Sequence, residues 1–558
     1  MRKIRHFAVL ALICWWITPA EAREPVRTRH AMVVSQEPLA TDVGVEVLKS
    51  GGNAVDAAIA VAFALAVTHP SAGNLGGGGF LLIRFADGRS TFLDFRERAP
   101  LSAGHDMYLD SGGMPTDASR LGWRASGVPG TVRGLEAAHR KYGRKAWAEL
   151  VAPAAKLARD GVELTFWEAR SLRQSAKQME RFPESKRIFL NDGKPFEAGD
   201  RLTQPELAAT LERIAREGAR DFYEGETAAR LVAEMSRNGG NITLEDLKAY
   251  AVVERKLMTG SYRGYDIITA PPPSSGGIGL LQMMGMLEGS GYEKPGAGSA
   301  ATAHYLAETM RRCYADRAAY LGDPDFVRIP VSGLINKEYA KKLAATIDRT
   351  RATPSDEVRA GNPSAFEPTE TTHLNVVDSE GNIAALTYTL NGSFGSGVMP
   401  AGLGFLLNNE MDDFAAKPGE PNMFGLVQGE ANSIAPRKRP LSSMTPTIVM
   451  RDGKPYMIVG APGGSRIITG VLQVILNVLD FGMTVQEAVD QPRLHHQWKP
   501  DKLYLEKGFS PDTKAILEKM GHQLEEAATV ASVEAVLIDG GWLQGAQNGR
   551  SSGKAAGY

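Results

Sequence analysis

The chain has 558 residues, of which 43% are hydrophobic and 23% charged, with 60 glycines and 31 prolines. This is the composition of an ordinary globular protein, so collagen, coiled coil and wholesale disorder are excluded. Lys and Arg total 63 against 64 Asp and Glu, a formal net charge of −1. Because such a balance offers no excess of basic groups for nonspecific phosphate contacts, we expect a large folded enzyme that binds no nucleic acid.

The N-terminus has the pattern of a secretory signal peptide over residues 1–22. Basic residues within 2–5 precede an apolar stretch over 7–17, and 20–22 has the small-x-small form of a cleavage site. A retained membrane anchor is the alternative, but the apolar stretch is short for a bilayer span. Cys313 would be the single cysteine left after cleavage, which suits a disulfide-free bacterial protein. We therefore expect a periplasmic or secreted protein with no membrane span in its mature form.

Helix and strand alternate in the first part of the chain. A spaced apolar pattern predicts an amphipathic helix that ends at Gly51-Gly52, and a second helix rich in Ala and Val is expected over 53–67. This second helix is apolar nearly all round, so it should be buried inside a layered structure. A hairpin is expected next, with strands over 80–85 and 91–95.

The central region, about 121–351, is richer in helices with charged outer faces, whose expected role is to cover a sheet. The clearest of them are predicted at 130–142, 147–160, 204–217 and 301–320. Residues 270–277, with the sequence APPPSSGG, are expected to form a rigid extended segment followed by a tight turn. Residues 351–370 are polar, contain prolines and lack periodicity, so they are the best candidate for an exposed, flexible segment.

Strands dominate after residue 370. Two hairpins and an apolar helix are predicted at 373–377 with 383–390, at 447–450 with 455–459, and at 467–481. Strands grouped between helical regions predict an α/β fold in which two sheets lie between helices, with the layer order α/β/β/α.

Thr371-Thr372 stands where the flexible segment ends and a strand begins. A threonine there has a purely structural explanation, because β-branched residues favour strands. The functional interpretation is that the chain is cut between Glu370 and Thr371. A free α-amine, with a reference pKa of about 7.7–8.0, could then act as the base for the hydroxyl of the same residue.

Other catalytic patterns lack essential parts. The sequence GRSSG at 549–553 matches G-x-S-x-G, but it lies too near the C-terminus for the acid and histidine that must follow it. The adjacent His495 and His496 could not share a metal on a helix, and neither a zinc-protease motif nor a Walker A sequence is present. We therefore expect no metal site and no cofactor.

Several sequence blocks, in the right order, resemble the γ-glutamyltranspeptidases. These blocks are Gly51–Ala58, Gly73–Gly79, Asp94–Glu97, Thr371–His373, Tyr388–Asn391, Leu406–Phe414, Pro440–Met444 and Pro462–Ser465. The resemblance covers about 33–558, and the number and order of the blocks make it specific.

The resemblance implies an N-terminal-nucleophile hydrolase that cuts itself into a large subunit, 23–370, and a small catalytic subunit, 371–558, which remain paired. Such an enzyme first transfers the γ-glutamyl group of glutathione or a related amide to its nucleophile, as an ester. It then passes the group to water or to the amine of an amino acid or peptide. Thr389 is similar to the residue that hydrogen-bonds the nucleophile. Gly463 and Gly464 precede a helix and can offer backbone N–H groups to an oxyanion; the alternative is a turn that requires positive φ.

A γ-glutamyl donor also carries an α-carboxylate and an α-ammonium, so its site needs a cation on one side and anions on the other. The expected substrate-binding residues, which match the family's positions, are Arg96, Asn391, Glu410, Asp413, Ser442 and Ser443. The arginine can bind the carboxylate bidentately with help from the serines, and the acids and amide carbonyl can accept from the ammonium. For each charged residue the alternative is a structural ion pair.

Two positions differ from part of the family. Glu410 stands where some members carry Gln, which makes the ammonium side more anionic. Phe424 lies in the loop 417–425, which resembles the lid of the bacterial enzymes, at a place where a Tyr often bonds the side chain matching Asn391. Because phenylalanine lacks the hydroxyl, we expect a leakier lid and a greater share of hydrolysis.

Two other functions fit parts of the pattern. A cephalosporin or glutaryl acylase acts on a substrate without the α-amine, so Glu410 and Asp413 would have no partner. A non-catalytic periplasmic amino-acid-binding protein or scaffold would need neither Thr371-Thr372 nor self-cleavage. Two unequal fragments from pure protein on a denaturing gel favour the enzyme, and one full-length band favours the binding protein.

Overall fold

Two antiparallel β-sheets of seven strands each form the centre of the structure, a computed structural model that describes residues 23–363 and 373–558. In spatial order the first sheet consists of β1 (Val26–Thr28), β18 (Trp542–Gln547), β17 (Glu534–Asp539), β13 (Lys454–Gly460), β12 (Thr447–Arg451), β9 (Tyr265–Thr269) and β8 (Met258–Tyr262). The second consists of β19 (Lys554–Gly557), β2 (Met32–Ser35), β10 (Leu374–Val377), β11 (Ile383–Thr389), β3 (Gly78–Arg84), β4 (Ser90–Phe95) and β7 (Val253–Arg255). Each sheet therefore combines strands from before and after residue 371.

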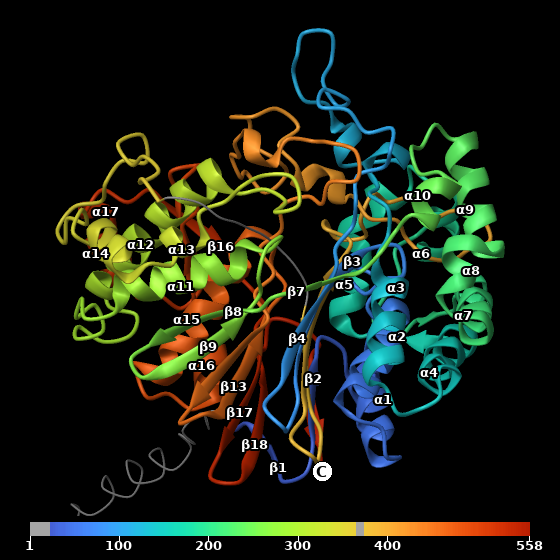
Figure 1. Ribbon diagram of the computed structural model, residues 1–558, viewed down its shortest axis with the longest axis horizontal. Coiled ribbons are helices and arrows are strands. Elements are labelled where there is room, and N and C mark those ends of the chain that lie inside the picture. Colours follow the sequence, from blue (N-terminus) through green and yellow to red (C-terminus); the bar gives the residue numbers. More distant parts are fainter. Residues whose placement is uncertain (1–22, 364–372) are drawn as a thin grey trace, which may run out of the picture.

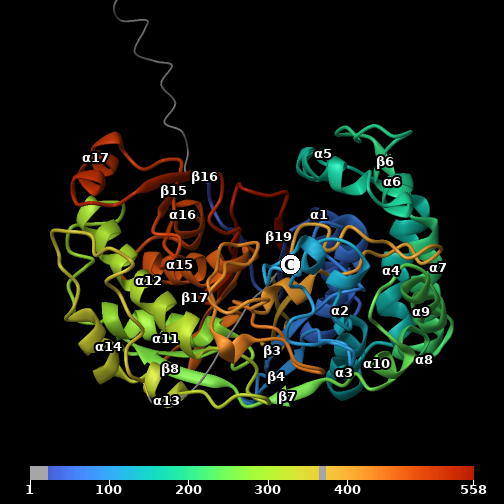
Figure 2. The same ribbon diagram turned by 90° about the horizontal axis from the view of Figure 1, so that it is seen from above.

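Helices cover the outer face of each sheet, on opposite sides of the molecule (Figures 1 and 2). Beside the second sheet lie α1 (Pro38–Lys49), α2 (Ala54–Thr68) and α3 (Thr131–Tyr142). Outside them, α4 (Trp147–Asp160) packs on α2 and α7 (Pro205–Glu217) packs on α4. The remaining helices of this side are α5 (Phe166–Met179), α6 (Pro183–Phe189), α8 (Ala219–Glu224), α9 (Glu226–Arg237) and α10 (Leu244–Lys248). Beside the first lie α11 (Ser275–Leu287), α12 (Ala300–Tyr320), α15 (Ile467–Leu479) and α16 (Val485–Asp490), with α13 (Val331–Leu334), α14 (Lys337–Ala344) and α17 (Pro511–Lys519) around them. The predicted α/β/β/α layering is confirmed.

Smaller elements lie outside these layers. They are the strand pair β5 (Val162–Glu163) and β6 (Arg201–Leu202), the three-stranded sheet β14 (Leu494–His495), β15 (Leu503–Glu506) and β16 (Leu524–Ala527), and the 3₁₀ helices Asp117–Ser119, Trp123–Ala125, Glu410–Asp413, Glu430–Asn432 and Gly464–Arg466.

The hydrophobic core continues through all four layers. Phe80 and Leu82 of β3 point between the two sheets, where they join a cluster that includes Ile458 of β13. Their neighbours Leu81 and Ile83 belong to the cluster under the helices of the second sheet. Because successive side chains of a strand point to opposite faces, a strand buried on both faces is apolar at consecutive positions, as β3 is over residues 80–83.

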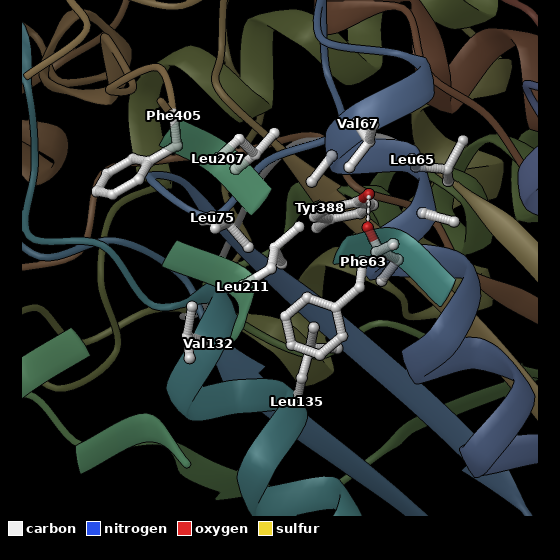
Figure 3. Close-up of a cluster of buried hydrophobic side chains, with 14 of the residues drawn as sticks. Phe63, Leu65, Val67, Leu75, Val132, Leu135, Leu207, Leu211, Tyr388 and Phe405 are labelled. Atoms are coloured by element: carbon white, nitrogen blue, oxygen red, sulfur yellow. Dashed lines mark hydrogen bonds between the residues drawn. The ribbon is translucent and has the colours of Figure 1, made fainter. Parts of the chain in front are cut away.

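The innermost helix of one outer layer is α2, which is buried along its whole length as predicted. Asn53 begins it with a capping box: its side chain accepts from the N–H groups of Val55 and Asp56, at 3.0 Å and 2.9 Å, and Asp56 accepts from the N–H of Asn53 at 3.0 Å. Tyr388 of β11 donates from its hydroxyl to the carbonyl oxygen of Ala62 at 3.0 Å, which connects helix and sheet across the cluster in Figure 3.

Most of the predicted helices and strands are confirmed to within one or two residues, but the turn predicted at the end of 270–277 is wrong. A turn closes earlier, where the N–H of Ser274 bonds the carbonyl of Pro271 at 3.0 Å, and α11 begins at Ser275. Gly276 therefore lies inside a helix, where a Cβ would come 2.4 Å from the carbonyl oxygen of Met444. This glycine allows a close approach between segments, which sequence inspection cannot distinguish from a turn.

The segment predicted to be exposed and flexible, 351–370, is only partly as expected. Residues 364–370 lie outside the described residues, and 351–363 contains no helix or strand. Ser355 is nevertheless buried, with its N–H bonded to Asp501 at 2.7 Å and its carbonyl to the indole of Trp498 at 2.8 Å. Its partners lie about 145 positions away in the chain, so local composition gave no sign of this anchoring.

Tyr388→Phe should lower the free energy of unfolding by about 1 kcal/mol, because it removes one buried hydrogen bond and leaves the ring packing in place. The midpoint of chemical denaturation measures the change. Tyr142→Phe is the matched control, since its hydroxyl bonds an exposed carboxylate at 3.2 Å, and we expect less than about 0.5 kcal/mol there. Equal effects of the two substitutions would contradict the role given to the Tyr388 hydroxyl.

Candidate active site

The end of strand β11 forms a tight turn that carries two predicted site residues. The Oγ1 of Thr389 accepts a hydrogen bond from the backbone N–H of Asn391 at 2.8 Å, and Asn391 has a left-handed φ of 73°. Asn74 holds the turn from behind, because its Nδ2 donates to the carbonyl oxygen of Thr389 at 2.9 Å. The predicted nucleophile Thr371, and Glu370 on the other side of the predicted cleavage point, lie outside the described residues.

A cavity of about 740 Å³ opens beside this turn. Thr389, Asn391, Gly463 and Gly464 all line it, so the fold brings four of the predicted catalytic and substrate-binding residues to one hollow. The volume lies in the range of pockets that enclose small-molecule ligands. The position is that of a candidate active site.

Gly463 and Gly464 connect β13 to α15, and both have left-handed φ, 146° and 55°. A Cβ on Gly464 would lie 2.9 Å from the ring of Phe424, and a Cβ on Gly463 would lie 3.1 Å from the carbonyl oxygen of Val530. Backbone angles and crowding therefore both favour glycine. Among the described residues neither glycine N–H has a hydrogen-bond acceptor, so both are free to bind a developing oxyanion.

Arg96 directly follows β4 and is fully buried among carboxylates. Its Nη2 donates to Oδ2 of Asp413 at 2.6 Å, its Nη1 forms an ion pair with Glu410, and Oε2 of Glu97 lies 3.8 Å from Nη1. The sequence analysis predicts that the arginine and the acids lie on opposite sides of a substrate. In this structure they pair directly with one another.

Ser442 and Ser443 follow the backbone that contacts the same guanidinium. The carbonyl oxygens of Pro440 and Leu441 each lie 3.4 Å from a nitrogen of Arg96. Both serines are fully buried, and the carbonyl of Ser442 accepts from a serine hydroxyl of α11 at 3.2 Å. The predicted carboxylate-binding residues are thus gathered around one buried cation.

Asn409 connects this buried cluster to the cavity. Its carbonyl accepts from Nδ2 of Asn391 at 3.0 Å, and its Oδ1 accepts from the N–H of Gly392 at 2.9 Å. The next residue in the chain is Glu410, which pairs with Arg96. Asn409 therefore joins the cavity wall, which it contacts by hydrogen bonds, to the ion cluster, which begins at the next residue of the chain.

The three carboxyls share a single guanidinium, and their pKa values respond to this. Burial raises the pKa of Glu97 to about 7 and that of Asp413 to about 6, against the opposing attraction of Arg96. Burial also raises the pKa of Glu410 well above its ordinary value. Burial alone would lower the pKa of Arg96, but the charges of the three acids outweigh it and raise that pKa. The cluster thus holds protons near neutral pH that another cation could replace.

The loop 417–425 closes one side of the cavity through two neighbouring side chains. The ring of Phe424 packs against Gly464. The sulfur of Met423 lies 3.8 Å from Nδ2 of both Asn391 and Asn409, so a thioether contacts the amide that a tyrosine hydroxyl often bonds in the family. Sequence reasoning selected Phe424 and missed Met423.

Comparison with known proteins identifies the family. The family model described as gamma-glutamyltranspeptidase matches residues 40–558. The chain belongs to the γ-glutamyltranspeptidase family. It is 50% identical to a glutathione hydrolase proenzyme of Escherichia coli strain K12, over 94% of this chain and 91% of that protein.

Solved structures show the same fold. A cephalosporin acylase from Bacillus halodurans superimposes with a TM-score of 0.85 at 26% identity, covering 96% of this chain and 97% of that one. The γ-glutamyltranspeptidase of Helicobacter pylori superimposes with a TM-score of 0.58 at 44% identity, covering 62% of this chain and 97% of that one. The chain is thus an enzyme of the γ-glutamyltranspeptidase family with the fold of the N-terminal-nucleophile hydrolases. In the ranges 23–363 and 373–558, no helix has both the length and the apolar character to cross a bilayer.

Glu97 and Asn409 were not selected from the sequence, although both lie in blocks that carry the resemblance to the family. The signal was therefore present, but nothing in it showed that Glu97 is buried against Arg96 or that Asn409 joins two clusters. Met423 lies in the loop 417–425 that resembles the lid, beside Phe424, but its sequence gave no sign that its sulfur contacts Asn391.

Glu97→Gln should change how stability depends on pH. In the folded protein the pKa of Glu97 is about 7, against an ordinary 4.5. Between pH 4.5 and pH 7 the folded state therefore holds a proton that the unfolded state has released. Its contribution to the free energy of unfolding therefore falls as pH rises through this window, on the order of 2 kcal/mol. Glutamine does not titrate, so the unfolding free energy of the variant relative to wild type should increase from pH 5 to pH 8.

Thermal or chemical unfolding of both proteins across this range measures the difference. The value at pH 4, where the carboxyl is mostly protonated in both the folded and the unfolded state, is the internal reference. A difference that does not change with pH would contradict the buried, proton-holding state of Glu97.

Proposed function

We propose that the protein is a γ-glutamyltransferase and glutathione hydrolase that matures by cutting itself between Glu370 and Thr371. Its large subunit, 23–370, and small subunit, 371–558, then work as a heterodimer. The substrates are glutathione or related γ-glutamyl amides as donors, and water, amino acids or dipeptides as acceptors.

The observation that carries the proposal is the buried cluster of Arg96 with Glu97, Glu410 and Asp413 next to the cavity. A γ-glutamyl group is a zwitterion at its α-carbon. Its carboxylate can take the place of an acid at the guanidinium, and its ammonium can replace the protons that the raised pKa values hold in the cluster. Binding then exchanges one set of ion pairs for another, which avoids leaving a buried charge unpaired.

The chemistry follows from this placement. The α-amine of Thr371 takes the proton from its own hydroxyl, and the oxygen attacks the γ-carbonyl carbon of the donor. The N–H groups of Gly463 and Gly464 bind the resulting oxyanion, where one donor is typically worth about 3–4 kcal/mol in the transition state. The ammonium formed on Thr371 gives its proton to the leaving amine, and the γ-glutamyl ester remains. Water or an acceptor amine then attacks the ester by the reverse route.

The register of the central hairpin supports Thr389 as the partner of the nucleophile. Leu374 pairs with Leu386, and the pairing runs antiparallel. We infer that in the mature enzyme the new N-terminus continues this register, which would set position 371 opposite Thr389. Asn391 already donates its backbone N–H to the Thr389 hydroxyl oxygen, which leaves the hydroxyl proton for the nucleophile.

An acylase remains the second candidate, because the Bacillus halodurans neighbour carries that name. A donor without an α-amine offers no cation to the three acids around Arg96. The higher identity to the Escherichia coli glutathione hydrolase proenzyme and the acidic excess in the cluster both favour a γ-glutamyl donor.

We also propose export to the periplasm or the medium. The support is the signal-like pattern of residues 1–22, which lie outside the described residues.

Thr371→Ala should leave the protein as one uncleaved, inactive chain, because it removes the hydroxyl on which both self-cleavage and ester formation depend. Wild type should give two unequal fragments on a denaturing gel, the smaller of which begins at Thr371 by N-terminal sequencing. Hydrolysis of a γ-glutamyl anilide should fall at least a thousandfold in the variant. Cleavage of the variant at the same bond would refute self-processing by this residue.

Phe424→Tyr should raise the ratio of transfer to hydrolysis several-fold, because a hydroxyl at this position can bond Asn391 and exclude water from the ester. The ratio of γ-glutamyl-dipeptide to glutamate, formed from a γ-glutamyl anilide with glycylglycine, measures it. Phe424→Leu is the control, since it changes the side chain without adding a hydroxyl. An unchanged ratio in the tyrosine variant would count against the leaky lid.

A further inference from the structure

The cavity beside Thr389 has a second wall that the chemistry above does not use. It is formed by His69, Ser71, Ala72, Arg120, Leu121, Ser175 and Gln178. Among the described residues that line the cavity there is no Asp or Glu, and Arg120 is the only Lys or Arg. An anionic group of a ligand would therefore meet one permanent positive charge and no carboxylate.

The guanidinium of Arg120 keeps unused hydrogen-bonding capacity. Its Nε lies 3.4 Å from Asp412 and its Nη1 lies 3.5 Å from Asp117, both long for charged hydrogen bonds. Asp412 already accepts shorter bonds from the Ser119 hydroxyl at 2.8 Å and the N–H of Met423 at 2.9 Å. Arg120 and both acids also line a second hollow of about 60 Å³, so Arg120 lies between the two hollows, and its Nη2 donates to no described residue.

The backbone of Arg120 is fixed against the catalytic turn. Its carbonyl oxygen accepts from Nδ2 of Asn409 at 2.9 Å. Asn409 in turn bonds Asn391 and Gly392, at 3.0 Å and 2.9 Å. The main chain of Arg120 is thus fixed by the same residue that joins the cavity wall to the ion cluster around Arg96.

The chemistry of the substrates supplies a group for this cation. The γ-glutamyl head of the donor satisfies its own charges at the cluster around Arg96. The other half of glutathione, cysteinylglycine, ends in a carboxylate, and a dipeptide or amino acid acceptor carries one as well. The leaving amine and the attacking amine occupy the same side of the γ-carbonyl carbon. The carboxylate of cysteinylglycine and the carboxylate of the acceptor therefore reach the same part of the cavity.

We propose that Arg120 binds the carboxylate of the leaving dipeptide and of the incoming acceptor, and so selects acceptors with a free C-terminus. This assignment rests on the proposed γ-glutamyl transfer. It adds a specificity residue on the acceptor side, separate from the residues that hold the γ-glutamyl group.

The test compares ligands that differ only in this carboxylate. Glycylglycine and glycylglycinamide serve as acceptors, and glutathione and γ-glutamyl-p-nitroanilide serve as donors, the anilide having no carboxylate on its leaving group. Arg120→Gln should raise the KM for glycylglycine and for glutathione about tenfold with kcat within twofold. The KM for glycylglycinamide and the hydrolysis of the anilide should stay within twofold of wild type.

Two further variants sharpen the result. Arg120→Lys should retain part of the preference for glycylglycine, because it keeps the charge and loses the forked geometry. Arg124→Gln is the matched control: Arg124 lies in the same segment, bonds the backbone carbonyl of Met107 and does not line the cavity, so no KM should change.

The outcomes separate the two proposals. If the wild type does not distinguish glycylglycine from its amide, or if Arg120→Gln weakens both equally, the assignment of Arg120 is overturned while γ-glutamyl transfer stands. If the wild type does not hydrolyse the anilide, the proposed function itself fails and the assignment fails with it.

Discussion

One buried cation holds the candidate active site of this protein together. Arg96 is removed from water and surrounded by Glu97, Glu410 and Asp413, so its charge must be balanced inside the protein. Three acids for one guanidinium give an excess of negative charge, which burial partly converts into bound protons. Under the proposed function, the excess of acids would pair with the ammonium of a donor whose carboxylate pairs with Arg96.

The cluster also lies across the proposed boundary between subunits. Arg96 and Glu97 come from the part before residue 371, and Glu410 and Asp413 come from the part after it. Both central sheets alternate in the same way, since β10 and β11 pair with β2 and β3 in one and β12 pairs with β9 in the other. A cut in the chain near residue 370 therefore leaves an uninterrupted hydrogen-bonded structure, and the fragments have no route to separate without breaking both sheets.

The cavity divides into two halves with different physical character. The half next to Thr389 and the two glycines presents backbone N–H groups and a fixed turn, which suits bond making and breaking at a carbonyl. The other half carries a single cation, Arg120, and no acid among its described residues. Under the proposed function, the group that leaves or enters would therefore contact other residues than the γ-glutamyl head, which is assigned to the cluster around Arg96.

The sequence by itself determined the local elements and the family. Period-2 and period-3.6 apolar patterns marked most strands and helices, and ordered blocks such as Tyr388–Asn391 marked the family, because both signals are carried by neighbouring residues. The family blocks also supplied the predicted site residues. Of these, Glu370 and Thr371 lie outside the described residues. The glycines at 276–277 and the anchored segment 351–363 were misjudged, because their surroundings come from distant parts of the chain.

Only the tertiary structure decided which groups touch and which are buried. Arg96 and Asp413 stand 317 positions apart, yet one hydrogen bond joins them. The pairing of cation and acids, the link through Asn409, the contact of Met423 with Asn391 and the exposure of Arg120 to the cavity all depend on how the two sheets pack. Burial, and with it the strength of every charge in the site, is a property of that packing, because desolvation is set by whatever surrounds a group in space and not by its neighbours in sequence.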